Sequence, residues 1–580
     1  MAQSIIDHLS QEAPMDIAKK DTSKVLAQFL GDKDFPVEWE HEWEKGLFWF
    51  YDDNHCPFPI SPMWWSLSGW WGPTIEYMFR RFDVDSAVRW HGKKVNGYLY
   101  SAIEPRDPKD VPEVQKYYFW VIGTYATNFL GWWKNRYLPE VFRNFEYLDN
   151  FDTENATDQE LMIYLEEAID IQERHFRLHW VLNWAQFAAS MNFNQTANSL
   201  IPDLNPDTLG KVNVSREDRN WDSLKALYDL KEEIKGNAEL KKLFESSETA
   251  TDLRPILEKA EVGKAFLKKV AEYAKEFGYK AVYPHEYVFK TYVEDDTPIL
   301  EQLKGYLASD WNYHDVYNNA IREQDESIAY MRDRLKDKSA EDKKKFEDAL
   351  QLNLNMLPLT PDHHFYFDQG TWARMRLVLI AIGKRLVKKG MIDDQEDILM
   401  LEYEQLRRYI GDPENYPGRK LIKQAKEEIE KAKKITPRDW VGTVTQWNMY
   451  EEPYHTLWGY PQKFEREQKG VSVKGTIEGL AASPGVIEGT ARIVKSSDEF
   501  DSVKQGEILV CIMTNPAWVV VFSKIAGIVT DSGGVLSHSA VVAREFMIPG
   551  VVGTANATKQ IKTGDRVRVD GNQGIVTILE

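Results

Sequence analysis

Cysteine is nearly absent from this sequence. Among its 580 residues only Cys56 and Cys511 occur, and they lie far apart. Two cysteines placed in this way cannot build a disulfide framework or a cysteine-based zinc site. A chain of this length can bury a sizeable core without such cross-links. The cysteine content therefore favours a reducing compartment, and we expect a cytoplasmic protein.

Long apolar runs and an excess of positive charge are also missing. The longest apolar stretches, such as Leu377 to Gly383, are too short to span a bilayer. The segment from Met1 to Lys20 lacks the continuous apolar core of a signal peptide. The chain has 72 basic and 91 acidic residues, a net charge of −19. Because a field of this sign repels nucleic acid and anionic membrane surfaces, we expect neither as a partner.

A glycine-rich phosphate-binding loop is absent from residues 1–460, which are rich in aromatic residues, Lys and Glu. Nineteen of the 20 tryptophans lie before residue 460. Apolar residues recur there at helical spacing, and the predicted helical segments are Leu161–Met191, Ile321–Met356, Trp372–Lys389 and Glu396–Tyr409. The charged middle of the second segment predicts the solvated tip of a helical hairpin.

The composition changes between Gly459 and Val471. The part that follows contains β-branched runs bounded by Gly, Asp or Lys, which predict strands around a helix at Ser537–Phe546. The predicted strands are Val486–Val494, Glu507–Ile512, Gly527–Thr530, Arg566–Asp570 and Gly574–Leu579. The sequence therefore predicts an α+β multidomain protein. Residues 1–465 would form a large, mainly helical domain, residues 466–478 a charged linker, and residues 479–580 a small domain with strands and a helix.

One aromatic stretch, from Phe48 to Pro73, interrupts the helical part. Pro57, Pro59 and Pro62 fall within six residues, and prolines at this density disfavour a helix. We predict an extended segment that crosses the helical domain and lines a pocket.

The most informative motif follows the predicted strand that ends at Thr530. Gly533 and Gly534 permit a tight turn, and Ser537 is placed to cap a helix that begins near His538. The N-terminus of a helix favours an anion, and a phosphoryl group on His538 would be such an anion. The same field disfavours imidazolium and leaves a ring nitrogen free to attack phosphorus. On its own, a histidine beside two glycines is more often structural. The neighbouring residues therefore decide between a structural and a catalytic role for His538.

Those neighbours resemble the phosphohistidine signature of the PEP-utilising enzymes. The matching residues are Thr530, Gly533-Gly534, Ser537-His538, Ala540, Ala543-Arg544 and Ile548-Pro549, with Ala482-Ser-Pro-Gly485, Gly489, Ala491-Arg492 and Thr514-Asn-Pro516 upstream. The resemblance covers Gly479 to Glu580. It implies a swivelling β/β/α domain in which His538 takes a phosphoryl group at one site and delivers it at another.

The resemblance also implies roles for the residues around His538. Thr530 and Ser537 would hydrogen-bond the ring or the phosphate, and the two glycines would let the backbone approach closely. Arg544 is either part of this phosphate site or engaged in a salt bridge inside the domain.

The resemblance restricts the phosphoryl donor. Relatives that use PEP carry a (β/α)₈ barrel after this domain, whereas the sequence ends soon after His538. We therefore expect neither PEP nor pyruvate as a substrate. Relatives that use ATP carry an ATP-grasp module, which we do not find here. The resemblance thus implies ATP and Mg²⁺ bound to a separate ATP-grasp subunit, and we predict no bound metal in this chain.

A second resemblance concerns the acceptor. Phe48–Pro59 and Asp362–Gln369 are similar to stretches of the helical substrate domain of rifampin phosphotransferase and, more closely, of the phosphohistidine-bearing catalytic subunit of phenylphosphate synthase. The latter enzyme splits its ATP-binding and phosphohistidine parts between subunits. It phosphorylates phenol and converts ATP and water to AMP and phosphate. A phenol or related phenolic compound is therefore the expected acceptor.

The second stretch departs from the rifampin enzyme, which has Arg and Lys where this chain has Pro361-Asp-His-His-Phe365. This difference argues against rifampin itself and favours histidine as the group that activates the hydroxyl. A phenol has a pKa near 10, as tyrosine does, so a hydrogen bond to a neutral histidine or a carboxylate would favour its phenolate.

The candidate acceptor-site residues follow from these stretches. We predict His363 and His364 as catalytic residues, and the predicted substrate-binding residues are His55, Asp368, Arg374 and Arg376. Asp368 would orient a histidine, and the arginines would steady the phosphoryl charge. The alternative for each is structural: a satisfied buried histidine or a paired arginine. The pairs Trp64-Trp65, Trp70-Trp71 and Trp132-Trp133 either surround an aromatic ligand or pack in the core.

Two other functions remain open from the sequence. In one, the same chemistry acts on another alcohol or a natural product. In the other, the chain is a phosphocarrier that passes its phosphoryl group to a partner protein, as enzyme I of the sugar phosphotransferase system does.

Overall fold

The helical part comes first and a small sheet domain follows it. The computed structural model describes residues 28–30, 35–53, 55–247, 249–308, 311–444, 475–495, 497–514, 518–522, 524–534, 537–546 and 548–579. Most elements before residue 444 are helices, and an eight-stranded sheet occupies the region after residue 475. The predicted fold class, a large helical region followed by a small β-rich domain, is confirmed. Most of the predicted linker, residues 466–478, lies outside the described residues.

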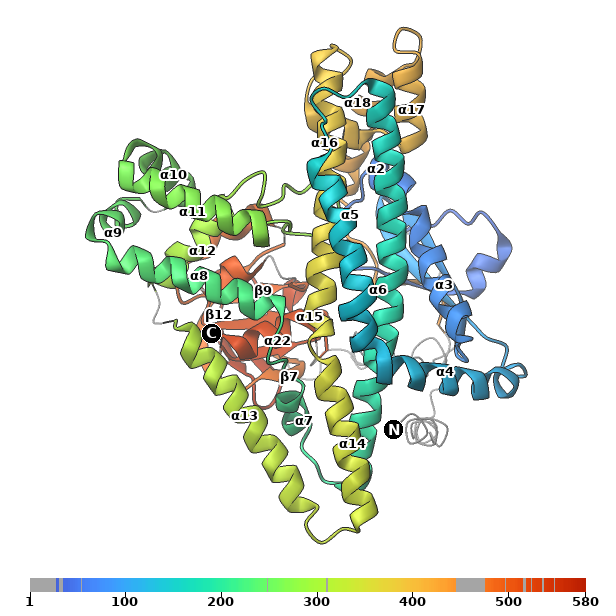
Figure 1. The fold of residues 1–580 in the computed structure, drawn as a ribbon, viewed down its shortest axis with the longest axis vertical. Coiled ribbons are helices and arrows are strands. Elements are labelled where there is room, and N and C mark those ends of the chain that lie inside the picture. Colours follow the sequence, from blue (N-terminus) through green and yellow to red (C-terminus); the bar gives the residue numbers. More distant parts are fainter. Residues whose placement is uncertain are drawn as a thin grey trace.

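Long helices that lie side by side form the spine of the helical part (Figure 1). The longest, α6 (Asp158–Leu200), has 43 residues and contains the predicted helix Leu161–Met191. It begins at a capping box in which the Thr157 N–H donates to Glu160 Oε2 at 2.7 Å. Its neighbours are α3 (Trp71–Phe82), α4 (Val111–Trp132), α5 (Leu138–Asn150), α14 (Ala340–Met356) and α16 (Trp372–Lys388).

Other helices form a second lobe and a hairpin. The lobe, with its own apolar core, consists of α8 (Arg219–Gly236), α9 (Ala238–Glu245), α10 (Ala250–Lys259), α11 (Glu261–Phe277) and α12 (Thr297–Ala308). The predicted hairpin over Ile321–Met356 is present as α13 (Tyr313–Arg334) and α14. Further helices of this part include α7 (Pro206–Val212), α17 (Tyr403–Gly411) and α18 (Gly418–Ala432).

The predicted helix Glu396–Tyr409 is wrong in part. The chain makes a 3₁₀ helix over Gln395–Met400 and starts α17 only at Tyr403. Glu402 precedes α17 and forms a capping box with Gln405, so the chain stops one helix and caps another within the predicted range.

An antiparallel five-stranded sheet lies beside the spine, and no prediction included it. Its order is β1 (Gln28–Leu30), β5 (Trp440–Val444), β2 (Phe48–Tyr51), β4 (Tyr98–Pro105) and β3 (Ala87–Val95). β1 and β5 pair Gln28 with Val444, so this sheet joins segments that are distant in sequence.

The aromatic stretch from Phe48 to Pro73 is extended only in its first part. It starts as β2 and continues without regular structure to Ser61. From Pro62 the chain is helical, as α2 (Pro62–Leu67) and then α3. Pro62 is the first helical residue, where no backbone N–H is needed, and the Ser61 hydroxyl accepts from the Trp64 N–H at 3.2 Å. The prediction was wrong there because proline at this position starts a helix.

A π-helical turn links two α-helices near the predicted catalytic histidines. α15 (Leu359–His363), the π-helix His364–Thr371 and α16 follow one another without a break. The sequence suggested that the two histidines lie just before a helix. In the structure they lie within one. π-Helical turns are rare and occur frequently at functional sites.

The C-terminal sheet is parallel in its centre and antiparallel at its edges. Its order is β6 (Thr476–Glu478), β13 (Ile575–Leu579), β12 (Arg566–Asp570), β8 (Val486–Ile493), β9 (Ile508–Cys511), β10 (Gly527–Thr530), β11 (Gly550–Val552) and β7 (Leu480–Ser483). The helices of this domain are α21 (Val519–Phe522), α22 (His538–Glu545) and α23 (Ala557–Gln560). Five of the eight strands were predicted, and the short β6, β7 and β11 were not.

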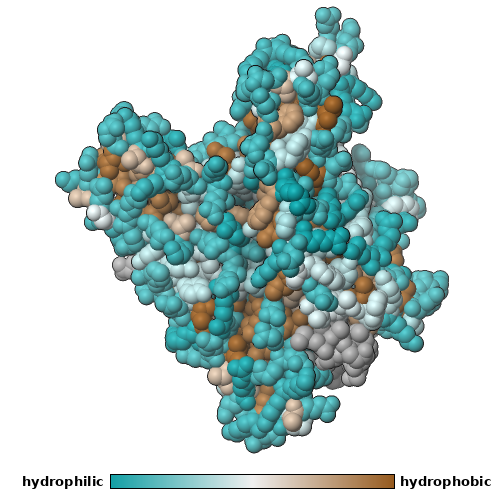
Figure 2. All heavy atoms as spheres, in the orientation of Figure 1, coloured by the Kyte–Doolittle hydropathy of each residue, from teal (hydrophilic) through white to brown (hydrophobic). Residues whose placement is uncertain are grey.

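On the face shown in Figure 2, hydrophobic residues form small separate patches among hydrophilic ones. Within the described ranges, no helix combines the length and apolar character needed to cross a bilayer.

Candidate active site

The loop after β10 makes a tight turn before α22. The Thr530 hydroxyl donates to the Ser532 carbonyl at 2.8 Å, and the Ser537 N–H donates to the Gly534 carbonyl at 3.0 Å. Gly533 has φ +107°, a conformation that favours glycine, and a Cβ at this position would lie 2.7 Å from Ser537 Oγ. Both the backbone and the available space therefore require glycine at position 533.

α22 begins directly after Ser537, where the sequence placed the start of a helix. Ser537 is the N-cap residue, but its side chain makes no capping hydrogen bond. Its buried Oγ has no hydrogen-bond partner among the described residues, so the hydroxyl remains available to a group at the helix N-terminus. His538 is the first residue of α22. The His538 side chain lies outside the described part of the chain, and its role stays a prediction.

The position of α22 is fixed by contacts inside the same domain. Arg544 Nη1 donates to the Ala482 carbonyl of β7 at 2.7 Å. The Thr514 and Ser539 hydroxyls lie 2.8 Å apart and join α22 to the loop after β9. The first contact agrees with a structural role for Arg544 inside its domain, and the phosphate role stays a prediction.

Two polar contacts join the C-terminal sheet domain to the helical part. The Ser532 hydroxyl donates to Asp53 Oδ2 at 2.5 Å, and both residues are buried. Lys524 Nζ lies 2.6 Å from Glu301 Oε1 on α12. The predicted phosphohistidine loop therefore contacts Phe48–Pro59, the first of the two stretches that resemble rifampin phosphotransferase.

Asp368 is the centre of a cluster of four histidines. The Nε2 atoms of His179 and His285 lie 3.2 and 3.3 Å from Asp368 Oδ1. His363 Nε2 lies 3.8 Å from Asp368 Oδ2, and His364 Nδ1 pairs with the same oxygen. All of these residues are buried except His364, whose side chain is 47% exposed. We call these five residues the Asp368 cluster.

Separate segments of the chain supply the Asp368 cluster. His179 lies on α6, His285 lies in the irregular segment between α11 and α12, and the remaining three residues lie on α15 and the π-helix. The segment that carries His285 is held by its neighbour Glu286, which accepts from the Ser61 backbone N–H and hydroxyl, both at 2.8 Å. Only the folded chain brings these side chains together.

His55 links the docked loop to the Asp368 cluster. Its Nδ1 lies 2.6 Å from Asp52 Oδ1, and its ring centroid lies 5.0 Å from that of His285. Burial alone would lower the pKa of His55, but the Asp52 carboxylate outweighs it and raises the pKa above its ordinary value. Since Asp53 receives the Ser532 hydrogen bond, a continuous run of polar side chains joins the loop to the cluster.

The cluster contains neutral imidazoles beside an anionic carboxylate. Burial lowers the pKa of His285 to about 4. Burial also lowers the pKa of His363 well below its ordinary value, and the nearby His364 and His179 add to the effect. For Asp368, burial alone would raise the pKa, but the same two histidines outweigh it and the pKa falls well below its ordinary value. His363 and His285 thus offer nitrogen lone pairs at neutral pH.

Aromatic rings surround the cluster. The Trp71 ring lies 5.3 Å from His55 and 5.7 Å from His285, and the Trp372 ring also lies 5.7 Å from His285. Of the predicted tryptophan pairs, Trp71 therefore borders the site, whereas Trp133 packs in the core of the spine.

The two predicted arginines are engaged in ion pairs. Arg374 binds both Asp149 oxygens at 2.8 Å, and Arg376 binds Glu294 at 2.8 and 3.0 Å. No hydrogen bond or ion pair of the described structure joins either arginine to the Asp368 cluster. These contacts agree with the structural alternative, and the substrate-binding role stays a prediction.

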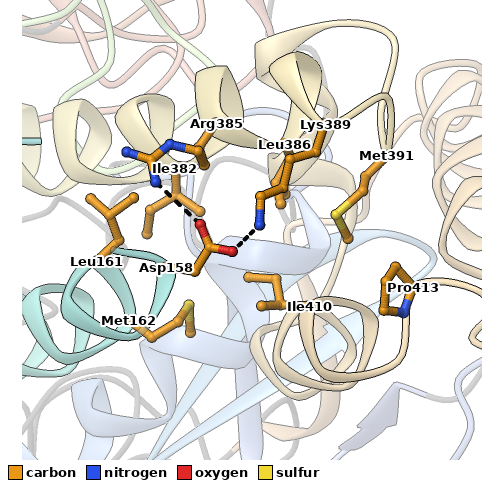
Figure 3. A pocket seen from close by; sticks show the side chains of 10 residues that line it. All are labelled: Asp158, Leu161, Met162, Ile382, Arg385, Leu386, Lys389, Met391, Ile410 and Pro413. Carbon is orange, nitrogen blue, oxygen red and sulfur yellow. Dashed lines mark hydrogen bonds and ion pairs between the residues drawn. The ribbon is translucent and has the colours of Figure 1, made fainter. Parts of the chain in front are cut away.

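Two cavities lie along α16, and no residue of the Asp368 cluster lines either of them. One, of about 430 Å³, is lined by Arg374 together with Tyr279 and Lys384. The other, of about 260 Å³, lies where the start of α6 meets the end of α16. There Asp158 is bound by Arg385 and Lys389 (Figure 3).

Sequence reasoning missed His179, His285, Asp52 and Asp53. His179 follows His175 by four positions in a predicted helix, a spacing that puts both on one face. The two aspartates stand inside the aromatic stretch but received no role. His285 lies in a short irregular segment, where no local pattern marks it.

Comparison with known proteins identifies two regions of the chain. Residues 503–574 match the mobile domain of the PEP-utilising enzymes, and residues 184–359 match the rifampicin phosphotransferase fourth domain. The second region holds His285 and the C-terminal part of α6, residues 184–200. The C-terminal part of the chain is thus similar to the mobile domain of the PEP-utilising enzymes. Its helical part is similar to that of the rifampicin phosphotransferases.

Several curated proteins are also similar to this chain. An uncharacterized phosphotransferase of Bacillus subtilis, YvkC, is 25% identical over 92% of this chain. Chondramide synthase cmdD of Chondromyces crocatus is 26% identical over 94% of the chain. The rifampicin phosphotransferase of Bacillus cereus is 33% identical over 35% of the chain. The chain spans 62%, 14% and 21% of these relatives' own lengths, respectively.

Proposed function

We propose that this protein is a phosphotransferase subunit that carries a phosphoryl group on His538 and transfers it to a hydroxyl group bound at the Asp368 cluster. One observation carries the proposal. The loop before α22, which the family uses for its phosphohistidine, donates a hydrogen bond from Ser532 to buried Asp53 and so contacts the segment next to the cluster. We take this docked arrangement as the one in which the phosphoryl group is delivered.

The phosphoryl donor that we propose is ATP, bound with Mg²⁺ on a separate ATP-grasp subunit. The support is the resemblance to a family in which ATP-dependent members carry such a module. No residue of the Asp368 cluster is needed for that half of the reaction.

In the transfer step, the bond between phosphorus and the His538 ring nitrogen breaks while a bond forms to the acceptor oxygen. The imidazole recovers its lone pair, and the hydroxyl proton must go to a base. His364 is the best candidate for this base. Its Nδ1 is held by buried Asp368 and its ring is partly exposed, so Nε2 can accept a proton while the carboxylate stabilises the imidazolium.

A phenol is the acceptor that we propose. The rings of Trp71 and Trp372 border the cluster, and flat apolar walls suit an aromatic ligand. A phenol also ionises more readily than an aliphatic alcohol, so one histidine base suffices to activate it.

The transfer step can be tested without the ATP-binding subunit. Phosphoramidate, a chemical phosphoryl donor to histidine, would load the purified chain, and the acid-labile, base-stable label would be located by mass spectrometry. We expect label on His538 and its transfer to added phenol. His538→Ala should take up no such label, and a variant that still phosphorylates phenol would refute the proposal.

The base is tested by His364→Gln. This variant should load normally but transfer roughly 10²- to 10⁴-fold more slowly, the usual contribution of a general base. His314→Gln, which removes an exposed histidine on α13, is the matched control and should transfer at the normal rate. Comparison of phenol with aliphatic alcohols then decides the acceptor class, and a preference for the latter would refute the phenolic part.

A further inference from the structure

The Asp368 cluster has an arrangement that hydrogen bonds alone do not explain. His179 Nε2 and His285 Nε2 lie within 3.3 Å of Asp368 Oδ1. That oxygen is nevertheless buried and accepts no hydrogen bond of regular geometry from the described residues. The nitrogens therefore lie near the oxygen without pointing their N–H groups at it.

The tautomer of His363 places a second electron-rich atom near Asp368. Its Nδ1 lies 3.1 Å from the Leu359 carbonyl oxygen, which can only accept, so Nδ1 carries the proton. In the neutral ring the lone pair is then on Nε2, which lies 3.8 Å from Asp368 Oδ2. A cation bound between these two electron-rich atoms would satisfy both, as buried charges in proteins are paired or coordinate metals.

We propose that His179, His363 and Asp368 bind a divalent transition-metal ion, with Zn²⁺ as the best match. One ligand atom from each of the three residues lies within 4.8 Å of the others, and all three side chains are buried. Zinc binds nitrogen and oxygen at about 2.0–2.2 Å, so two ligand atoms of a tetrahedral site lie about 3.3 Å apart. The separations of 3.2 Å from His179 Nε2 to Asp368 Oδ1 and of 3.8 Å from His363 Nε2 to Asp368 Oδ2 are near this value.

The surroundings of the three ligands match those of known metal sites. The bond from His363 Nδ1 to the Leu359 carbonyl orients the ring and fixes its tautomer, as the partners of metal-bound histidines do. Three protein ligands leave one position of a tetrahedral ion open.

The use of this open position rests on the proposed function, whereas metal binding itself does not. A hydroxyl group bound to the metal loses its proton more easily, because the ion stabilises the alkoxide or phenolate. His364, which pairs with Asp368 and whose ring centroid lies 4.1 Å from that of His363, would receive that proton. The site would then serve an acceptor that coordinates through a phenolic or alcoholic oxygen.

Metal binding is tested on the purified, chelator-treated chain without donor or acceptor. Co²⁺ replaces Zn²⁺ in such sites and absorbs visible light, so its titration reports both affinity and coordination. We expect stoichiometric binding, displacement of Co²⁺ by Zn²⁺, and a rise in melting temperature with metal. Asp368→Asn and His363→Gln should each weaken binding at least a hundredfold.

His175→Gln is the matched control. His175 is also a buried histidine of α6, one turn before His179, but its ring nitrogens contact Thr371 and Asn144 and no cluster residue. This variant should bind Co²⁺ within threefold of the unmodified chain. An unmodified chain that gives neither a Co²⁺ spectrum nor a metal-dependent melting shift would overturn the inference, even if a cluster variant fails to fold.

The inference and the proposed function fail in different ways. If phosphorylated chain transfers to phenol at full rate in excess chelator, the metal has no part in the reaction and its use in activating the acceptor is overturned, while the proposed function stands. If the chain binds metal at these residues but phosphorylated His538 transfers to no hydroxyl compound, the proposed function fails and the metal site stands.

Discussion

The hydrogen bond from Ser532 to Asp53 should control how long the mobile domain stays docked. Asp53 is a buried carboxylate, and a hydrogen bond to a charged group contributes about 1.5–3 kcal/mol. Ser532→Ala removes the donor and leaves the carboxylate in place. Since 1.4 kcal/mol is a factor of ten, the ratio of undocked to docked molecules should rise roughly 10- to 150-fold.

Single-molecule fluorescence energy transfer can count the undocked molecules. Dyes on cysteines introduced at Lys241 and Lys562, both exposed, would report the separation of the second lobe and the mobile domain. The native Cys56 and Cys511 are fully buried, so they should not react under native conditions. Ser502→Ala removes an exposed serine of the mobile domain and is the matched control.

The same variant should separate the two half-reactions. Loading of His538 by phosphoramidate does not need the docked arrangement and should proceed normally, whereas transfer to the acceptor should slow in proportion to the lost docking. An undocked fraction within twofold of that of Ser502→Ala would refute the reasoning, because it would mean that this hydrogen bond does not stabilise docking.

Two further predictions concern stability. Burial raises the pKa of Glu286 to about 7, against an ordinary value of 4.5. The folded state therefore binds more protons than the unfolded state between these values, and stability falls as pH rises from about 4.5 to 7. At 1.36 kcal/mol per pKa unit the loss of stability amounts to about 3 kcal/mol. Glu286→Gln should therefore flatten the pH dependence of the unfolding midpoint in chemical denaturation. Equal slopes for both proteins would contradict this prediction. Gly533→Ala should lower the melting temperature and slow loading of His538, because the new Cβ strains the backbone and meets Ser537 Oγ at 2.7 Å. Gly506→Ala, which shares a positive φ but has open space around it, should cost less, and equal costs would show that the contact with Ser537 is unimportant.

The mobile domain could be predicted in detail because its signals are local. The strand before Thr530, the glycine turn and the start of α22 follow one another within a dozen residues, and each has its own sequence pattern. The five-stranded sheet gave no such signal. Its pairing of Gln28 with Val444 depends on contacts between segments from opposite ends of the helical part, and local periodicity does not record such contacts.

The acceptor site was predicted in part for the same reason. His363, His364 and Asp368 stand within six residues, so a short stretch was enough to draw attention to them. His179 and His285 come from other segments, and only packing brings them to Asp368. Arg374 and Arg376 were selected for their charge, but the carboxylates that bind them, Asp149 and Glu294, are distant in sequence.

The π-helical turn at His364–Thr371 gives the acceptor site an unusual dependence on chain length. Such a turn amounts to one residue inserted into an α-helix, and each α-helical residue advances about 100° around the axis. Deletion of a single residue there would restore a regular helix from Leu359 to Lys388 and turn Asp368 away from the histidines that precede it. Loss of one codon could therefore abolish the site without breaking the helix. Insertion of one codon into an ancestral α-helix would likewise be enough to create the site.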